Sequence, residues 1–272
     1  MHQTRSVTLV GAGKMGGAFL VGALRAGMPG SSITVIDPQP SQIIQELAGS
    51  NGISLNPHPE ALREPNLLLL AVKPQMFDDA LSALTMLAGQ ETLIVSLMAG
   101  KTIQNIRLRL PRGGAFVRIM PNLPAAVGRG VTVCYASPEV SSSQRAWVDQ
   151  LLDSIGIVEW VENEDLIDAA TAISGSGPAY VFYLVEALAL AGVQAGLPPS
   201  LSARIARATV EGAGELMFRE PNIEVTAFRQ NVTSPSGPTA AALDLLMAAD
   251  GLQPLLTAAV IAAKKRATEL SD

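Results

Sequence analysis

Short apolar runs alternate with helix-like segments through the first 160 residues of the chain. The apolar runs are SVTLV, SITVID, NLLLLAV, TLIVSLM, GAFVRIM, VTVCYA and GIVEWV. Most of them lead into a segment with apolar residues at helical spacing, such as GKMGGAFLVGALRAG or QMFDDALSALTML. Strands that are apolar on both faces and alternate with helices are typical of a parallel sheet covered on both sides. The pattern therefore predicts an α/β fold with a doubly wound parallel sheet.

After Asn163 the strand-like runs stop, and only helical patterns remain. Proline and glycine positions predict helices that begin near Gly177 and after Pro199, around residues 224–230, after Pro238 and from Leu252 to Leu270. A chain of 272 residues is long enough for two domains. We therefore expect a first domain over residues 1–161 and an all-helical second domain over residues 162–272.

The apolar residues of the second domain are not confined to one helix face. Leu188 and Leu190, for example, add to apolar positions around several sides of one predicted helix. A helix that is apolar all round needs cover on every side. We therefore expect the helical domain to complete its core against another copy of the chain, in a homodimer.

Composition and charge exclude several classes of function. The net charge is −5, the chain has no long basic run, and Cys134 is the only cysteine. These features argue against nucleic-acid binding, disulfides and thiolate metal sites, and we expect no metal. The N-terminus lacks a signal-peptide core, and the longest apolar runs are interrupted or too short for a membrane span. A cytoplasmic protein without membrane partners is predicted.

A glycine-rich motif follows the first predicted strand directly and precedes a helix. In LVGAGKMGGAF the glycines Gly11, Gly13 and Gly16 have the spacing GxGxxG, with Lys14 and Met15 between the last two. Without side chains, the backbone can approach a pyrophosphate, whose charge is stabilised by free amides at the helix start. In this context the motif predicts a Rossmann-type dinucleotide-binding domain.

Asp37 ends the second predicted strand, 21 positions after Gly16. An acidic residue at this place accepts hydrogen bonds from the adenosine ribose and repels a 2′-phosphate. No Arg or Lys occurs between Asp37 and Arg63. The cofactor is therefore predicted to be NADH or NADPH, with Asp37 favouring NADH.

Two further strand ends, AVKP and SLMAG, are expected at the same edge of the sheet, where open α/β folds bind ligands. An ordinary solvated lysine is an equally good interpretation of Lys73. The predicted cofactor contacts from the first domain are Gly11, Gly13, Lys14, Met15, Gly16, Asp37, Ala71, Val72, Lys73, Pro74, Met98 and Ala99.

The second domain has few groups that could act as a base. The histidines are His2 and His58, and no lysine occurs between Lys101 and Lys264. Oxidation of an alcohol needs a group that accepts the hydroxyl proton, usually His or Lys, so this class is disfavoured. Reduction of a protonated C=N bond needs only a site that orients the iminium ion and neutralises its charge.

Three segments are candidates for binding such a substrate. Ser174–Pro178, which includes Ser176, and Ser234–Thr239 are both expected to begin helices, whose free amides and hydroxyls bind carboxylates. Serine-capped helices without a ligand are the alternative. Glu164 either pairs with a cationic nitrogen or is a solvated acid at a helix start.

The motifs GAGKMG, AVKPQ, MPNLP, DLIDAATAISGSGPAY and NVTSPSGPT, in this order and spacing, resemble the Δ1-pyrroline-5-carboxylate reductase family. The resemblance runs from Val7 to the last helix. It implies a Rossmann domain followed by a helical dimerisation domain, with a site completed by a second subunit and often a pentamer of dimers. It also implies reduction of 1-pyrroline-5-carboxylate to L-proline with hydride from NADH or NADPH.

The resemblance also assigns roles to residues of the second domain. Ser234, Gly237 and Thr239 match the loop that holds the substrate carboxylate, and Thr239 is placed near the ring nitrogen; Ser234 and Thr239 are the predicted catalytic residues. Asn231 matches a residue near the nicotinamide. Glu164 matches an acidic residue near the substrate. Ser176, in the SGSGPAY motif, is also a predicted substrate contact.

The chain departs from the family pattern at several places. Where the usual loop reads GGTT or GGAT, this one reads SGPT, and Pro238 lacks the amide N–H that could bind a carboxylate. Pro59 stands where the family often has an asparagine, although Asn56 is close by. An upstream acidic residue of the family aligns only loosely with Glu220. A buried ion-paired arginine and a substrate-steering charge are both open interpretations of Arg118.

These departures leave two alternatives beside the leading function. One is a related cyclic-imine reductase with a different ring acid, and the other is a non-catalytic dinucleotide-binding homologue. A β-hydroxyacid dehydrogenase would need a lysine in the first helix of the second domain, and residues 165–196 contain none.

Overall fold

The computed structural model describes residues 5–271. It divides into two compact units, one comprising the chain up to Ser176 together with the segment from Ala263 onward, the other comprising Gly177–Ala262. The first helix after the sheet belongs to the first unit because it packs on strands β6 and β7. The compact units therefore divide at a different place from the domains expected at residues 161 and 162, and that domain division stays a prediction.

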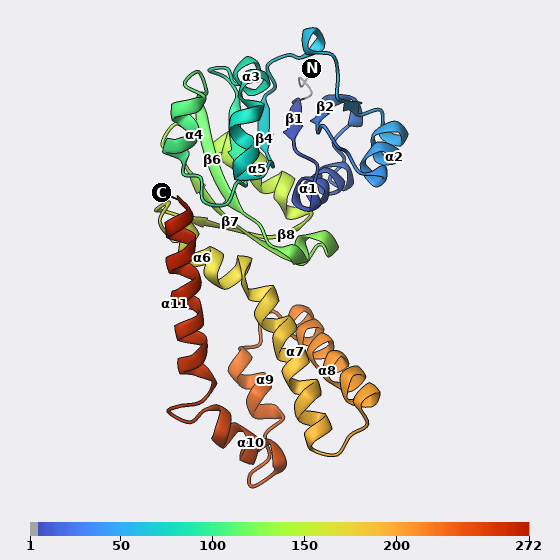
Figure 1. Cartoon of the computed structure of the whole chain (residues 1–272), viewed down its shortest axis with the longest axis vertical. Helices are drawn as coiled ribbons and strands as arrows, with labels where there is room; N and C mark the ends of the chain where they lie inside the picture. Colours follow the sequence, from blue (N-terminus) through green and yellow to red (C-terminus); the bar gives the residue numbers. More distant parts are fainter. Residues whose placement is uncertain (1–4, 272) are drawn as a thin grey trace. The chain divides into compact units, whose positions relative to one another are not determined.

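The first unit is built on one eight-stranded sheet with the order β3-β2-β1-β4-β5-β6-β7-β8 (Figure 1). All neighbouring strands are parallel except β6 and β7, so the predicted doubly wound, mainly parallel sheet is confirmed. The two-residue strand β3 was not predicted. The strands are β1 Val7–Val10, β2 Ile33–Ile36, β3 Ser54–Leu55, β4 Leu67–Leu70, β5 Leu93–Ser96, β6 Ala115–Met120, β7 Gly130–Ala136 and β8 Gly156–Val161.

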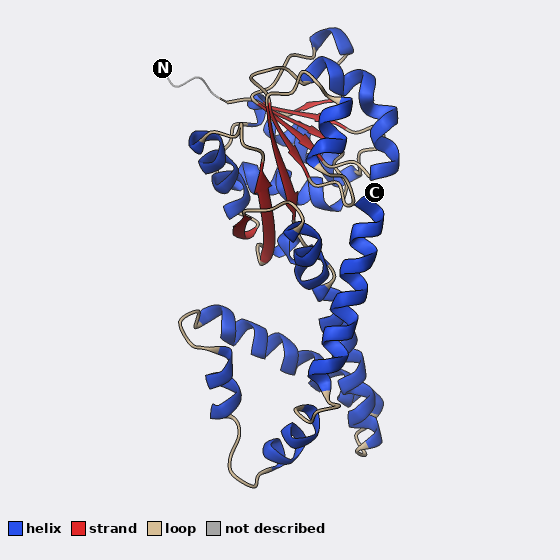
Figure 2. Cartoon of the chain, turned by 90° about the vertical axis from the view of Figure 1, so that its left-hand side faces the viewer, coloured by secondary structure: helices blue, strands red, loops and turns tan. Residues whose placement is uncertain are grey.

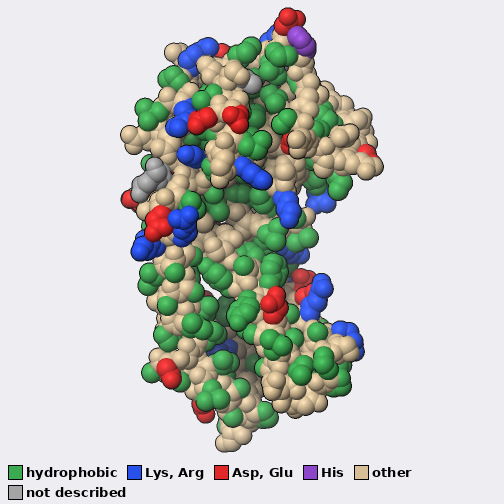
Figure 3. All heavy atoms as spheres, viewed as in Figure 1, with side chains coloured by type: hydrophobic (Ala, Val, Ile, Leu, Met, Phe, Trp, Pro, Cys, Tyr) green, Lys and Arg blue, Asp and Glu red, His purple; other side chains and the backbone are tan. Residues whose placement is uncertain are grey.

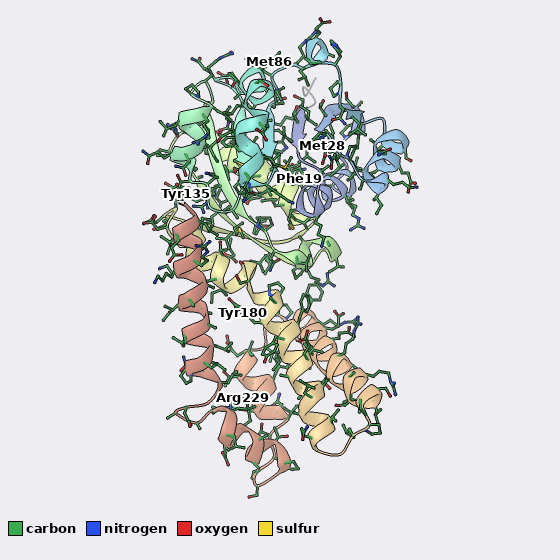
Figure 4. The ribbon with its side chains drawn as sticks, viewed as in Figure 1. Phe19, Met28, Met86, Tyr135, Tyr180 and Arg229 are labelled. Atoms are coloured by element: carbon green, nitrogen blue, oxygen red, sulfur yellow. The ribbon has the colours of Figure 1, made fainter. Side chains whose placement is uncertain are left out.

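Helices cover both faces of this sheet (Figure 2). Strand β4 shows the consequence, because Leu67 and Leu69 belong to one core cluster and Leu68 and Leu70 to the other. Each fully buried leucine stabilises the fold by roughly 1.5–3 kcal/mol. Phe19 of α1 belongs to the first of these clusters, and Met28, which follows α1, packs against it (Figure 4). The helices are α1 Lys14–Arg25, α2 Gln42–Asn51, α3 Phe77–Leu87, α4 Ile103–Arg109, α5 Ser142–Asp153 and α6 Leu166–Ala170.

One helix continues without a break from Leu166 to Gln194. It consists of α6, a π-helical turn at Thr171–Gly175 and α7, Gly177–Gln194. Helix α7 thus begins at Gly177, as predicted, but it continues directly from α6, so Ser174–Pro178 is not the free helix start that was expected. Pro178 has no N–H for the carbonyl four residues earlier, and Asn122 Nδ2 donates to that carbonyl, Ser174 O, at 3.0 Å.

The second unit contains only helices, at the predicted places. They are α7, α8 Pro199–Arg219, α9 Val225–Asn231, α10 Pro238–Leu246 and the start of α11, Leu252–Ser271. Helices α7 and α8 pack on each other, and Ser202 Oγ donates to Ala189 O at 2.6 Å. The side chains of this unit remain largely uncovered.

Large apolar side chains of the second unit are exposed within one chain. Tyr183 is 70% exposed and Leu190 is 69% exposed, and hydrophobic side chains spread over the surface of these helices (Figure 3). Within the described residues, the helix Leu166–Gln194 is the one long and apolar enough to cross a membrane by length and composition. Apolar surface of this extent indicates contact with another apolar surface.

Candidate active site

The carboxyl ends of strands β2, β1 and β4 converge at the glycine-rich loop. Gly11 N donates to Ile36 O at 2.8 Å, and Ala71 N donates to Val10 O at 2.8 Å. These bonds bring together the predicted cofactor contacts Gly11, Asp37 and Ala71. Strand order reverses between β1 and β4, which is the place where open α/β sheets bind ligands.

The three glycines of the motif differ in what a side chain would meet at their positions. Gly11 has φ +91°, and a Cβ there would lie 2.7 Å from Ala71 O. A Cβ on Gly16 would overlap the carbonyl oxygen of Gly11. At Gly13, in contrast, no described residue beyond its neighbours and its own helix comes within 4 Å of the place for a Cβ. Two glycines thus allow close packing, whereas Gly13 leaves space for a ligand at the start of α1.

Asp37 turns its carboxylate toward this loop. Ala12 N donates to Asp37 Oδ2 at 2.7 Å, and Gln39 N donates to Oδ1 at 2.8 Å. Asn56 fixes the backbone of Asp37, because its Oδ1 accepts from Asp37 N at 2.8 Å and its Nδ2 donates to Asp37 O at 2.7 Å. The role of Asn56 was not predicted, although its left-handed φ of +48° is of a kind in which asparagine is enriched.

The residues that follow β4 and β5 differ in how exposed they are. Lys73 is exposed just before the short 3₁₀ helix Pro74–Met76, and the half-buried Ala71 and Val72 precede it. Met98 is only 2% exposed, and its side chain belongs to the core beside β4. Ala99 is exposed beside it.

Arg118 is the centre of a buried cluster of charges. Its Nη1 lies 3.3 Å from Glu164 Oε1, and its Nη2 lies 3.1 Å from Asp168 Oδ1. The Arg118 side chain is 5% exposed, so of its two open interpretations the structure supports the buried, ion-paired arginine. Glu164 Oε1 also accepts from Ile103 N, the first residue of α4, at 2.8 Å. Glu164 is therefore not a freely solvated acid, and Asp168 is a member of the cluster that was not predicted.

The Ser234–Thr239 loop joins α9 to α10 in the second unit. Asn231 is the last residue of α9. Ser236 has φ +59°, the left-handed conformation that favours glycine, so the backbone keeps a glycine-like shape where the family's usual loop has glycine. Gly237 is the N-cap of α10 and Pro238 is its first residue, a position that tolerates proline.

The hydroxyls and amides of this loop are arranged at a helix start. Gly237 N donates to Ser234 O at 3.1 Å, and Thr233 Oγ1 donates to Arg229 O at 2.6 Å. Arg229 of α9 (Figure 4) places Nη1 3.3 Å from Met247 Sδ, at the other end of α10. Ser234 is exposed, and its hydroxyl is accessible to a ligand.

The SGSG segment does not provide a second helix start. Ser176 N donates to Thr171 O at 2.8 Å, and Ser174 Oγ donates to Ala170 O at 2.9 Å. These bonds close the π-helical turn, so the expected set of free amides at Ser174–Pro178 is corrected. Ser176 remains half-buried and stays a predicted substrate contact.

Comparison with known proteins covers the whole chain. Residues 164–270 match the model for pyrroline-5-carboxylate reductase dimerisation, and residues 6–100 match the model described as NADP oxidoreductase, coenzyme F420-dependent. A pyrroline-5-carboxylate reductase of Pseudomonas aeruginosa is 36% identical over 271 residues, which cover 99% of this chain and 98% of that one. The chain belongs to the pyrroline-5-carboxylate reductase family.

Solved structures of the family agree with this assignment. A pyrroline-5-carboxylate reductase from Coxiella burnetii is 32% identical, with a TM-score of 0.85 over 99% of this chain and 100% of that one. The Plasmodium falciparum pyrroline carboxylate reductase, solved with NADP bound, is 28% identical, with a TM-score of 0.77 over 98% of both chains. The resemblance noted from the motifs is thereby confirmed, as is the Rossmann-type domain followed by a helical dimerisation domain.

Proposed function

We propose that the protein reduces the C=N bond of 1-pyrroline-5-carboxylate, giving L-proline, with hydride from NADPH or NADH. The observation that carries the proposal is full-length membership of the pyrroline-5-carboxylate reductase family together with an accessible Ser234–Thr239 loop at a helix start. The protein would be an oxidoreductase acting on a CH–NH group, with a role in proline biosynthesis.

The cofactor site is assigned to the loops at the strand ends of the first unit. The space beside Gly13 and the amides at the start of α1 suit a pyrophosphate, and Asp37 suits the adenosine ribose. The backbone at Ala71–Pro74 and Met98–Ala99 and the side chain of Asn231 would complete the site. A bound nicotinamide supplies the hydride, while these residues orient it and exclude water.

The substrate site is assigned to the second-unit loop. Ser234 Oγ and the first-turn amides of α10 would bind the carboxylate, with Gly237 giving close backbone approach. The Thr239 hydroxyl would hydrogen-bond the ring nitrogen. Hydride adds to the imine carbon, and the electron pair of the C=N bond remains on the nitrogen, which already carries its proton. No side chain of the loop has to transfer a proton in that step.

Glu164 is proposed to act through charge. Its cluster contains two carboxylates, on Glu164 and Asp168, and one guanidinium, on Arg118, so its formal charge is negative. A fixed negative charge stabilises an iminium ion relative to the neutral imine. Ser176 is proposed as a further substrate contact.

The proposal also covers cofactor preference, assembly and location. A carboxylate at Asp37 favours NADH over NADPH, because it repels a 2′-phosphate. A second copy of the chain, rather than a membrane, is proposed to cover the apolar helices of the dimerisation domain, and five such dimers form the proposed decamer. A site completed by the second subunit and a cytoplasmic location are further parts of the proposal.

The test is the initial rate of NADPH and NADH oxidation with racemic 1-pyrroline-5-carboxylate. The parent should turn over, and Ser234→Ala should raise the KM for the imino acid by about tenfold, the effect of one lost hydrogen bond to a charged group. Ser143→Ala, on the exposed surface of α5, is the matched control and should behave as the parent. Failure of the parent to oxidise either cofactor with this imine would contradict the proposal.

Pro238 motivates one further candidate, a cyclic-imine reductase with a different ring acid. Proline removes one amide from the first turn of α10, so a substrate with a differently placed carboxylate would suit the loop better. Faster reduction of the six-membered imino acid than of the five-membered one would support this candidate. Recovery of activity on the five-membered substrate in Pro238→Thr would identify the loop as the cause.

A further inference from the structure

The last turn of α11 contacts the loop that follows β5. Residues 252–262 of α11 belong to the second unit, and residues 263–271 belong to the first. Gly100, in the loop, has φ +68°, and a Cβ there would lie 2.9 Å from the carbonyl carbon of Leu270 and 3.1 Å from its Cβ. The backbone of the helix end thus lies directly against the loop.

A hydrogen bond fixes the same helix end to the buried charge cluster. Thr268 Oγ1 lies 3.2 Å from Asp168 Oδ2, across 100 positions of sequence, and 3.3 Å from Lys264 O of its own helix, so its one proton is shared between these two acceptors. The other oxygen of Asp168 pairs with Arg118, and Arg118 pairs with Glu164. Glu164 in turn accepts from Ile103 N, immediately after the loop. A continuous set of contacts therefore runs from the end of α11 to Gly100, inside the segment 97–102, and to Ile103, directly after it.

At the start of the loop Leu97 N donates to Leu70 O at 3.0 Å, and at its end Thr102 caps α4, but the bonds between these two ends are longer. Met98 N donates to Ser96 Oγ at 3.3 Å, and Lys101 N donates to Met98 O at 3.4 Å. Both distances are at the long end for hydrogen bonds of these types. The position of the exposed backbone around Ala99 therefore depends on what packs against Gly100.

We propose that the last turn of α11 positions loop 97–102 for dinucleotide binding, with Thr268 and Gly100 as positioning residues. The inference rests on the proposed function, in which the backbone of Met98 and Ala99 contacts the cofactor. Neither Thr268 nor Gly100 has to touch the dinucleotide. Displacing the helix end weakens cofactor binding because the loop loses the surface that holds it.

The first test is Gly100→Ala, whose Cβ would push the last turn of α11 away. Gly52→Ala is the matched control, because Gly52 has the same φ of +68° and, among the described residues other than its neighbours, nothing within 4 Å of its added Cβ. Dissociation constants for NADPH and NADH are measured without imine, by quenching of protein fluorescence. We expect Gly100→Ala to raise them by about fivefold, a usual size for residues that act through others, and Gly52→Ala to leave them unchanged.

The second test removes one hydroxyl. Thr268→Val should raise both dissociation constants and speed amide hydrogen exchange in residues 97–102, while Thr268→Ser should restore the parent values. Thr85→Val is the control, because Thr85 lies on the exposed side of α3 and its Oγ1 donates to the helix carbonyl of Leu81. With saturating cofactor, the KM for the imino acid should stay at the parent value in Thr268→Val.

The outcomes separate this inference from the proposed function. Unchanged dissociation constants in both Gly100→Ala and Thr268→Val would overturn the inference, even if the variants were less stable. A parent that binds NADPH but reduces no imine would contradict the proposed reaction and leave the binding test intact. A parent that binds neither dinucleotide would overturn both.

Discussion

Removal of the Arg118 guanidinium should destabilise the first unit more than loss of any exposed ion pair. In Arg118→Met the carboxylates of Glu164 and Asp168, which are 20% and 12% exposed, lose their buried partner. Breaking a buried pair at one side typically costs 3–5 kcal/mol, and partial access of water to Glu164 points to the lower end. We expect the free energy of unfolding to fall by about 3 kcal/mol.

The assay is urea unfolding followed by circular dichroism, at one protein concentration because the dimer contributes to stability. Arg109→Met is the control; Arg109 pairs with Asp78 at 2.7 Å, but the two side chains are 34% and 67% exposed, so the cost should stay below about 1 kcal/mol. Adding Glu164→Gln and Asp168→Asn to Arg118→Met should recover stability by removing the unpaired charges. A cost below about 1 kcal/mol for Arg118→Met, or no recovery in the triple variant, would refute the reasoning.

Three other outcomes are expected. Gly13→Ala should keep the parent melting temperature yet weaken NADPH binding at least about tenfold. Gly16→Ala should lower the melting temperature, because the Cβ at residue 16 would meet the backbone of Gly11. Calorimetry measures the melting temperatures, and fluorescence titration measures NADPH binding. Hydrogen bonds from Arg107 hold the pKa of the Glu139 carboxyl at about 2, below its ordinary 4.5, so the pair stabilises the fold at neutral pH and less as the pH falls through this range. Glu139→Gln should therefore cost under about 1 kcal/mol at neutral pH, with the difference narrowing in unfolding curves taken at lower pH. Leu190→Asp should produce monomers in analytical ultracentrifugation, since Leu190 is 69% exposed in the single chain; an unchanged sedimentation coefficient would remove it from the interface.

The strands and helices that could be predicted are those with a strong local signal. Strand β4 is four leucines, and each leucine is buried by one face or the other of the sheet. Strand β3, Ser54–Leu55, has two residues and no apolar run, so its pairing with β2 depends on tertiary structure. The antiparallel pairing of β6 and β7 also escaped prediction, because a short 3₁₀ segment at Leu123–Val127 replaces a helical crossover.

The serine, glycine and proline residues at Ser174–Pro178 did not indicate that helical structure precedes α7. Serine, glycine and proline together usually mark a helix start. Here Asn122, more than fifty positions earlier in the chain, accepts from Val131 N at 2.9 Å and donates to the carbonyl that the proline leaves free. No local pattern reports that partner, and so the sequence predicted a free helix start where α7 continues from α6.

The part of the candidate site that could be predicted is the part formed by elements close together in sequence. The glycine motif and Asp37 lie on consecutive elements of one fold with known geometry, and the structure brings them together. The pairing of Arg118 with Asp168 spans fifty positions and joins a strand to a helix, so sequence gave two interpretations of the arginine and none of its partner. Asn56 lies nineteen positions after Asp37, so its hydrogen bonds to the Asp37 backbone could not be predicted from local sequence.

The course of α11 limits how the chain can be divided into fragments or recombined with related chains. Its final residues belong to the nucleotide-binding unit, although that unit is otherwise formed by the chain up to Ser176. A fragment cut after residue 176 would keep the whole sheet and lose the donor to Asp168. Recombination that exchanged residues 1–176 as one block would therefore separate the sheet from the last turn of α11, which belongs to the same unit. The two units are not interchangeable modules.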